Sequence, residues 1–268
     1  MLGILDWKPI DRASIARGLK TEWFGRTLVI LDECSSTNDV LERMAAEGAP
    51  HGAVVIAETQ RAGRGRFGRA WYSPRGGIWM SVLIKSQYGI SAADSLPVVA
   101  AVGTAKTLLK WRVEAEVRWP NDVVAGGRKI VGILVESKSK GNELIYSTVG
   151  IGINVNVDTS KIESIRSSST SLMTLLGTPI NREELIVGLL LDLEAVCESL
   201  QESESAVLDL LRAFDYSRGK RVRVRTADRV VTGLFDGYET LARVRILSGR
   251  GFESVETSAV VSVDYESY

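Results

Sequence analysis

Histidine and cysteine are scarce in this 268-residue sequence, which contains one histidine, His51, and two cysteines, Cys34 and Cys197. A Ser-His-Asp or Cys-His catalytic mechanism would therefore have to use His51 as its base. The sequence also has no cluster of histidines and cysteines that could bind a catalytic zinc ion. His51 follows Pro50 in a connection, where an exposed loop histidine is a commoner outcome than a catalytic one. Two isolated thiols form no disulfide framework and are typical of a reducing cytosol, so we expect a cytoplasmic location.

Long apolar runs and a basic leader are also missing. No stretch of 18 apolar residues occurs, so we expect no membrane-spanning segment. The start, MLGILDWKPIDRAS, has no basic segment followed by an apolar core, so we expect no signal peptide. Lys+Arg and Asp+Glu both total 33, and this zero net charge disfavours a protein that binds nucleic acid through its overall field.

The length and the 45% hydrophobic content suffice for a large domain plus a small one. A short helical segment is expected within residues 1–25. The apolar spacing predicts strands over 26–34, 52–60, 76–85, 114–119, 129–137 and 143–157, and helices over 35–50, 95–111 and 181–201. After Tyr216 the sequence alternates apolar and polar residues between short turns, which predicts a small antiparallel barrel. We therefore divide the chain into residues 1–215 and 216–268.

Local signals define several element ends. Ser36 and Asp39 have the spacing of a capping box at the start of the helix over 35–50. Asn181 is the expected N-cap of the helix over 181–201. The pair Gly126-Gly127 is expected to join the strands over 114–119 and 129–137. Glycines in the strand over 143–157 stand where side chains would obstruct a neighbour.

Positive charge is concentrated in one glycine-rich stretch, QRAGRGRFGRAW (60–71). From Thr59 to Ala93 there are five arginines, one lysine and no acidic residue. The segment GRGRFG fits G-x-G-x-x-G, but a tryptophan, a proline and a strand follow it instead of the helix that a dinucleotide site requires. A flexible arginine loop can instead hold a carboxylate beside the α-phosphate of ATP, so that an acyl-adenylate forms. A solvated basic loop or an RNA-binding loop is the alternative interpretation.

Three further segments accompany this stretch: SSTND (35–39), RWPNDVVAGGRKIVGILVE (118–136) and GIGINVN (150–156). With QRAGRGRFGRAWYSPRGG they resemble, in order and spacing, the signature set of biotin–protein ligases. Residues 216–268 resemble the small C-terminal domain of that family more loosely. The resemblance implies an α+β catalytic domain, with a mixed sheet and flanking helices like those of class II aminoacyl-tRNA synthetases, and an SH3-like β-barrel after it.

The resemblance also implies an activity in two steps. Biotin and ATP with Mg²⁺ give biotinyl-5′-AMP and pyrophosphate, and a lysine of a biotin carboxyl carrier protein domain then takes the biotinyl group as an amide. The residues implied for biotin are Ser36, Thr37, Asn38, Gln60, Gly63, Arg64, Gly65, Arg66, Lys129, Gly132 and Leu134. Those implied for ATP or the adenylate are Arg66, Trp71, Arg118, Asn121, Asp122, Lys129 and Asn154.

Among these residues, Lys129 and Arg66 are the implied catalytic cations, because they would neutralise charge as two anions meet. Asp122 is the weak candidate for Mg²⁺ or for the incoming lysine. The loop from Arg61 to Arg69 is expected to be mobile without ligand and to close over the adenylate. Within that loop only Phe67 and Ala62 offer apolar anchoring.

Three departures from the family pattern qualify the resemblance. Arg118 stands where the family usually has lysine before Trp-Pro-Asn-Asp, so the charge is kept but the donor geometry differs. The Gly-Glu pair expected near Ser258-Ala259 is absent. Residues 1–25 are few for the winged helix-turn-helix of biotin-sensing repressors, so we expect a ligase that does not bind DNA.

Two other functions remain open from the sequence. A lipoate–protein ligase of similar architecture would use the same acyl-adenylate logic, although the loop GRGRFGRAW favours biotin. A nucleic-acid-binding regulator would use the basic loop together with RGKRVRVR (218–225). A homodimer is compatible with the family and with an exposed sheet edge.

Overall fold

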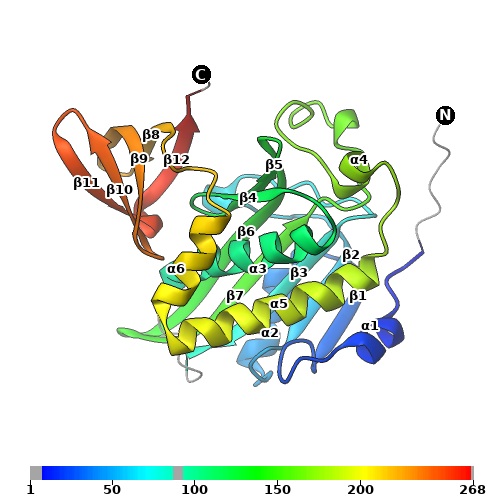
Figure 1. Cartoon of the computed structure of the whole chain (residues 1–268). Coiled ribbons are helices and arrows are strands. Elements are labelled where there is room, and N and C mark those ends of the chain that lie inside the picture. The colour runs from blue at the N-terminus through cyan, green and yellow to red at the C-terminus, as the bar shows by residue number, and fades with distance from the viewer. Residues whose placement is uncertain (1–7, 87–92, 267–268) are drawn as a thin grey trace.

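The computed structural model describes residues 8–86 and 93–266. Its larger sheet consists of β1 (Leu28–Cys34), β2 (Val54–Gln60), β3 (Ile78–Lys85), β4 (Ala115–Arg118), β5 (Asp122–Ala125), β6 (Arg128–Lys140) and β7 (Glu143–Ile153). These strands lie in the order β1-β2-β3-β7-β6-β5-β4 (Figure 1). The pair β1–β2 is parallel and the other pairs are antiparallel, which confirms a mixed sheet.

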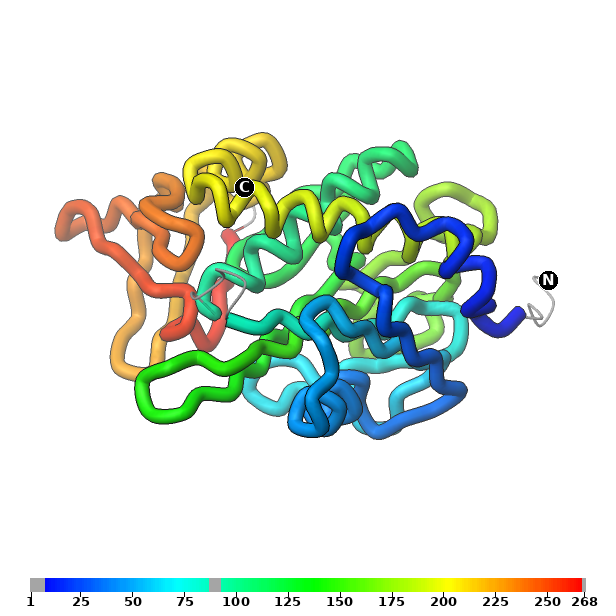
Figure 2. The backbone as a smooth tube through the Cα atoms, turned by 90° about the horizontal axis from the view of Figure 1, so that it is seen from below, coloured from blue at the N-terminus to red at the C-terminus, as the bar shows by residue number. Residues whose placement is uncertain are grey.

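Helices cover both faces of this sheet. The described helices are α1 (Arg12–Gly18), α2 (Thr37–Ala46), α3 (Leu96–Lys110), α4 (Leu172–Leu176), α5 (Arg182–Glu202) and α6 (Glu204–Ala213). On one face α3 packs against β5, β6 and β7, with α5 lying across it, whereas α2 packs against β2, β3 and β7 (Figures 1 and 2). Because α3 lies between the sheet and α5, its apolar residues are buried almost all around. Part of the segment expected to be helical, residues 1–7, lies outside the described residues.

The local expectations for the larger sheet are partly confirmed. Asn181 caps α5, its side chain accepting a hydrogen bond from the amide of Glu184. Gly126 and Gly127, both at positive φ, turn from β5 into β6 rather than joining β4 to β6 directly. The four-residue β5 was missed because its length gives almost no periodic signal. The helix α6, which leads into the C-terminal sheet, was also missed.

The C-terminal strands form a separate antiparallel sheet of β8 (Arg221–Thr226), β9 (Val230–Thr240), β10 (Arg243–Ser248), β11 (Gly251–Glu256) and β12 (Val260–Tyr265), in the order β11-β10-β9-β8-β12. Burial alternates strictly along β8, as the sequence pattern predicted. The sheet adjoins one end of the larger one (Figure 1). Trp119, which follows β4, reaches it: the indole packs against Phe235, with ring centroids 5.9 Å apart, and donates to the hydroxyl of Thr257.

His51 is buried, with 5% of its surface exposed, so the expected exposed loop position is wrong. Its Nδ1 accepts a hydrogen bond from the amide of Lys85 at 3.1 Å, and its ring lies 4.4 Å from that of Trp23. Burial, together with the smaller effect of the positive charge of Lys85, lowers the pKa of His51 to about 4. The single histidine is therefore a neutral packing residue away from the site described below.

Candidate active site

One cavity of about 680 Å³ collects nearly all of the residues that the sequence assigned to substrates. It is lined by the start of α2, the loop after β2, strands β5 to β7 and strand β12. Gly63 is the one assigned residue that does not line it. A Cβ on Gly63 would lie 2.5 Å from the carbonyl oxygen of Trp71, so this glycine closes the base of the loop.

The arginine loop, residues 61–69, is joined to the body by hydrogen bonds at its two ends. The amides of Arg61 and Ala62 donate to the carbonyls of Cys34 and Ser35, and the amide of Trp71 donates to the carbonyl of Gly63. Within the loop, the amide of Gly65 donates to the carbonyl of Arg69 at 2.7 Å. The loop thus has a defined path across the cavity.

Two arginines anchor the middle of this loop in different directions. The guanidinium of Arg64 binds the carboxylates of Asp39 on α2, at 2.6 Å, and of Glu136 on β6, at 3.3 Å. The guanidinium of Arg66 donates to the carbonyl of Val260 at 2.6 Å and to that of Thr257. Burial lowers the pKa of Arg66, and a guanidinium group stays positively charged in proteins. Phe67 is 59% exposed, so the loop is held by charge contacts and not by apolar packing of this side chain.

At the start of α2 the expected capping box does not form. Ser36 is the N-cap residue, but its side chain makes no capping bond, and the carboxylate of Asp39 pairs with Arg64 rather than with the backbone of Ser36. The side chain of Gln60 takes over, since its Oε1 accepts from the amide of Thr37 at 2.9 Å. Nε2 of Gln60 donates to the hydroxyl of Ser73. The hydroxyl of Ser36 is therefore left beside the cavity that it lines.

Glycines on β6 and β7 form the floor of the cavity. Gly132 and Gly152 are directly paired across the two strands, and the ring of Trp71 lies over both. A Cβ would lie 2.7 Å from this ring at Gly132 and 2.5 Å from it at Gly152. At Gly150 a Cβ would lie 2.6 Å from Oδ1 of Asn38. The missing side chains are thus what allow Trp71 and Asn38 to reach the floor.

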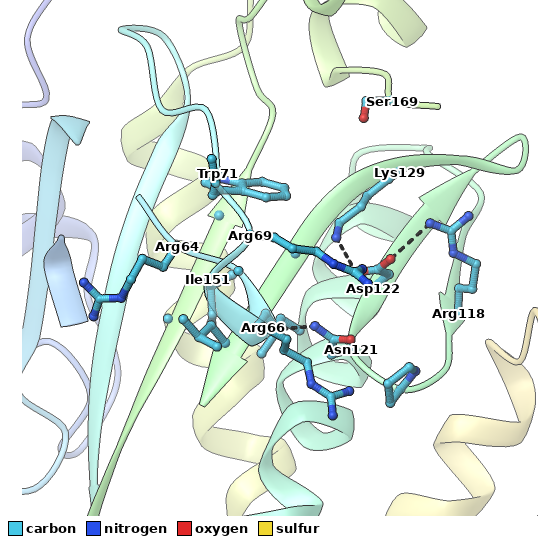
Figure 3. Close-up of a pocket in the computed structure, with 18 of the residues that line it drawn as sticks. Arg64, Arg66, Arg69, Trp71, Arg118, Asn121, Asp122, Lys129, Ile151 and Ser169 are labelled. Carbon is cyan, nitrogen blue, oxygen red and sulfur yellow. Dashed lines mark hydrogen bonds and ion pairs between the residues drawn. The ribbon is translucent and has the colours of Figure 1, made fainter. Parts of the chain in front are cut away.

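A cationic cluster occupies the other end of the cavity (Figure 3). Nζ of Lys129 lies 2.5 Å from one carboxylate oxygen of Asp122, and the guanidinium of Arg118 lies 3.0 Å from the other. All three side chains are 20–25% exposed. Asn121 is bound to the backbone of Ile133, its side chain donating to the carbonyl at 2.7 Å. Figure 3 shows Arg64 pointing away from this cluster, whereas Arg69 extends toward it.

Asn154 lines the cavity with its side chain already engaged. The residue is buried, and its Nδ2 donates to the carbonyl of Thr170 at 3.1 Å. Its backbone also binds Ile130 and Leu172. Asn154 therefore holds the serine-rich loop against the sheet. The expected contact with the nucleotide would have to use the side-chain atoms of Asn154 that are not bonded to Thr170, namely Oδ1 and the second N–H of Nδ2.

Several residues that line the cavity, or that bind residues lining it, were given no role from the sequence. Ser81 on β3 and Glu136 on β6 bind Asn38, and residues Val260–Tyr265 of β12 line the wall beside Arg118. A serine in an apolar strand and a glutamate in a solvent-facing one are ordinary in themselves. The role of β12 follows only from the position of the C-terminal sheet.

Comparison with known proteins identifies the family of the chain. The model of the Biotin/lipoate A/B protein ligase family matches residues 31–154. The biotin--[acetyl-CoA-carboxylase] ligase of Mycobacterium tuberculosis is 32% identical over 234 residues, which cover 81% of each protein. The chain belongs to this family.

Other members of the family match most of the chain. The bifunctional ligase/repressor BirA of Bacillus subtilis is 29% identical over 255 residues, covering 94% of this chain and 78% of that protein. The biotin protein ligase of Aquifex aeolicus in complex with biotin and ATP superposes with a TM-score of 0.78 and 26% identity, covering 90% of this chain and 100% of the other. These matches confirm the sequence-based prediction of a biotin protein ligase, and the C-terminal sheet falls within them.

Proposed function

We propose that the chain activates biotin with ATP to biotinyl-5′-AMP and transfers the biotinyl group to a lysine of a biotin carboxyl carrier protein domain. The observation that carries this proposal is the polarity of the cavity described above. One end has hydroxyl and amide groups around Thr37, and the other has cations around Lys129. The polar ureido ring of biotin fits the end around Thr37, and the carboxylate of biotin and the phosphates of ATP fit the cationic end around Lys129.

In the first step the carboxylate oxygen of biotin attacks the α-phosphorus of ATP, and pyrophosphate leaves. Lys129 and Arg118 bring two positive charges to one carboxylate, that of Asp122, so this cluster keeps an excess of one. Arg66 and Arg69 add two more cations to the same cavity. This excess favours an anionic transition state, because cations placed in advance stabilise charge as it develops. Lys129 and Arg66 are the proposed catalytic cations, and Trp71 and Asn154 are proposed to contact the adenylate.

In the second step the amine of the carrier lysine attacks the acyl carbonyl, and AMP leaves. Acyl-adenylates hydrolyse, so water must be kept out until the amine arrives. The arginine loop spans the cavity from Asp39 on α2 to the turn at Thr257–Val260. We propose that this loop closes over the adenylate and opens for release.

Magnesium is proposed to enter with ATP as part of the substrate. Among residues 8–86 and 93–266, no three His, Cys, Asp or Glu side chains gather as a metal site. Mg²⁺ commonly binds through one or two carboxylates and the phosphates of its nucleotide. Asp122 is the proposed carboxylate, and it would have to exchange an ion pair with Lys129 for the metal.

The finer classification of the fold is also a proposal. The mixed sheet with helices on both faces supports the class II aminoacyl-tRNA synthetase-like type, and the five antiparallel strands support an SH3-like barrel over 216–268. A homodimer, a cytoplasmic location and the absence of DNA binding are likewise proposed. No helix of the described residues is long and apolar enough to span a membrane.

Mass analysis tests the function directly. The chain is incubated with biotin, ATP–Mg and a biotin carrier domain, and a single biotinyl adduct on the carrier is expected. ATP–pyrophosphate exchange with biotin or with lipoate as the acid separates the two branches of the family. Exchange that depends on lipoate and not on biotin would overturn the proposal.

A further inference from the structure

Two residues that the resemblance did not assign to substrates, Ser81 and Glu136, hold the side chain of Asn38 in one orientation. Nδ2 of Asn38 lies 2.7 Å from a carboxylate oxygen of Glu136 and 3.4 Å from the carbonyl of Leu134. Its Oδ1 lies 2.6 Å from the hydroxyl of Ser81. Ser81 is fully buried on β3 and Asn38 is 3% exposed, so water does not compete for the hydrogen bond between these two side chains.

The chemistry of these partners decides which atom of the amide faces which way. A carboxylate and a backbone carbonyl only accept hydrogen bonds, so Nδ2 must be the atom that faces Glu136 and Leu134. Oδ1 must then face Ser81, and it lies over Gly150, where a Cβ would approach it to 2.6 Å. Gly150 itself lines the cavity floor. The atom that Asn38 presents at the floor is therefore an acceptor.

The hydroxyl of Thr37, next to Asn38, also acts as a hydrogen-bond acceptor. Ser81 has one hydroxyl proton, and Oδ1 of Asn38 requires it, so the hydroxyl of Thr37, 2.7 Å from that of Ser81, receives none from it. The proton of Thr37 goes to Ser81 or to Oε1 of Gln60, which lies at 3.2 Å. Oγ1 of Thr37 is left with acceptor capacity. This end of the cavity thus offers oxygens that need a donor.

We infer that Ser81 and Glu136 are positioning residues that select the ureido ring of biotin, by orienting Asn38 so that its Oδ1 accepts from a ureido N–H. This inference rests on the proposed function. The dithiolane ring of lipoate has no N–H group, so the second lone pair of Asn38 Oδ1 and the acceptor capacity of Thr37 would have no donor. A site built to hydrogen-bond a group rejects an analogue that lacks it, because its own polar atoms then stay unpaired. Glu136 keeps Asn38 from flipping, and Arg64 beside it balances its charge.

The test uses ATP–pyrophosphate exchange with the full chain and two acids, biotin and an isosteric analogue with oxygen in place of both ureido N–H groups. In Glu136→Ala the amide of Asn38 loses the shorter of the two bonds that hold Nδ2, so it flips more easily. We expect the KM for biotin to rise about tenfold, while kcat and the KM for ATP stay within about twofold. The preference for biotin over the analogue, as a ratio of kcat/KM, should fall by a similar factor. Ser81→Ala should act in the same direction.

Two matched variants separate orientation from general damage. Glu136→Gln keeps an acceptor oxygen for Asn38 and should restore the preference for biotin. Lys138→Ala changes the next residue on the same face of β6 and should leave both acids unaffected. Glu136 is 43% exposed, so its variants are expected to fold. They test the inference even if Ser81→Ala does not fold.

The outcomes are distinguishable. A wild-type preference for biotin that is unchanged in Glu136→Ala would overturn the inference and leave the proposed function standing. Equal losses toward biotin and the analogue in Glu136→Ala would also overturn it, since they would indicate a structural role. A wild-type chain without biotin-dependent exchange would overturn the proposed function and the inference together.

Discussion

Removing the amino group of Lys129 is expected to abolish most synthesis of biotinyl-AMP while leaving the fold intact. Lys129 sits at the start of β6, 25% exposed, with its Nζ 2.5 Å from Asp122. In Lys129→Ala the carboxylate of Asp122 keeps its partner Arg118 at 3.0 Å, so no buried charge is left alone. The unfolding free energy should therefore change little.

The size of the catalytic loss follows from the charge that Lys129 provides. Two unit charges about 4 Å apart at an effective dielectric constant near 20 interact by roughly 4 kcal/mol. Because the side chain is partly exposed, solvent screens part of this, and Arg66 and Arg69 remain in the cavity. We expect a loss of about 3 kcal/mol in transition-state stabilisation, which is on the order of a hundredfold in rate.

The assay is biotin-dependent ATP–pyrophosphate exchange, with circular dichroism as the measure of folding. Lys140→Ala, at the exposed far end of the same strand, is the matched control and should keep full activity. Lys129→Arg keeps the charge and should retain more activity than Lys129→Ala. A folded Lys129→Ala with more than about a tenth of the wild-type rate, a loss below roughly 1.4 kcal/mol, would refute the reasoning.

Three further predictions concern other residues. Arg118→Lys should keep near-normal exchange activity, since the shorter cation can still pair with Asp122; a collapse of activity would mean that the guanidinium fork is needed. Trypsin should cut the loop between Arg61 and Arg69 more slowly with biotin plus ATP–Mg than without them, and equal rates at confirmed occupancy would argue against a lid. The depressed pKa of His51, about 4 against 6.5 when unfolded, means that the unfolded chain takes up a proton first as the pH falls. Folding stability should thus decrease from pH 6.5 downward, by roughly 2 kcal/mol at pH 5 for this group. Urea titrations should show a shallower pH dependence in His51→Asn, and the same dependence in both proteins would exclude His51 as its source.

Local patterns in the sequence were sufficient for the family, the main helices and most strands of the larger sheet. Each depends on residues that are close in the chain. The long helix α5 follows from its periodicity and from the cap at Asn181, and the antiparallel C-terminal strands follow from strict alternation. The segments SSTND, GRGRFG and RWPND each meet at the cavity because each follows or precedes a strand of one sheet. The glycines of β7 were expected to make room, and Trp71 and Asn38 are the residues that use it.

Only the tertiary structure decided the partners of the polar side chains. Asp39 looks like half of a capping box, yet it binds Arg64, which is 25 positions away in the chain. His51 looks exposed, yet β3 covers it through Lys85. Ser81 and Glu136 come next to Asn38 through the pairing of β3, β7 and β6, and Thr257 and Val260 reach Arg66 from 191 and 194 positions away. Hydrogen bonds and ion pairs depend on distance in space, and a pattern that repeats every two to four residues contains no information about contacts made across a sheet.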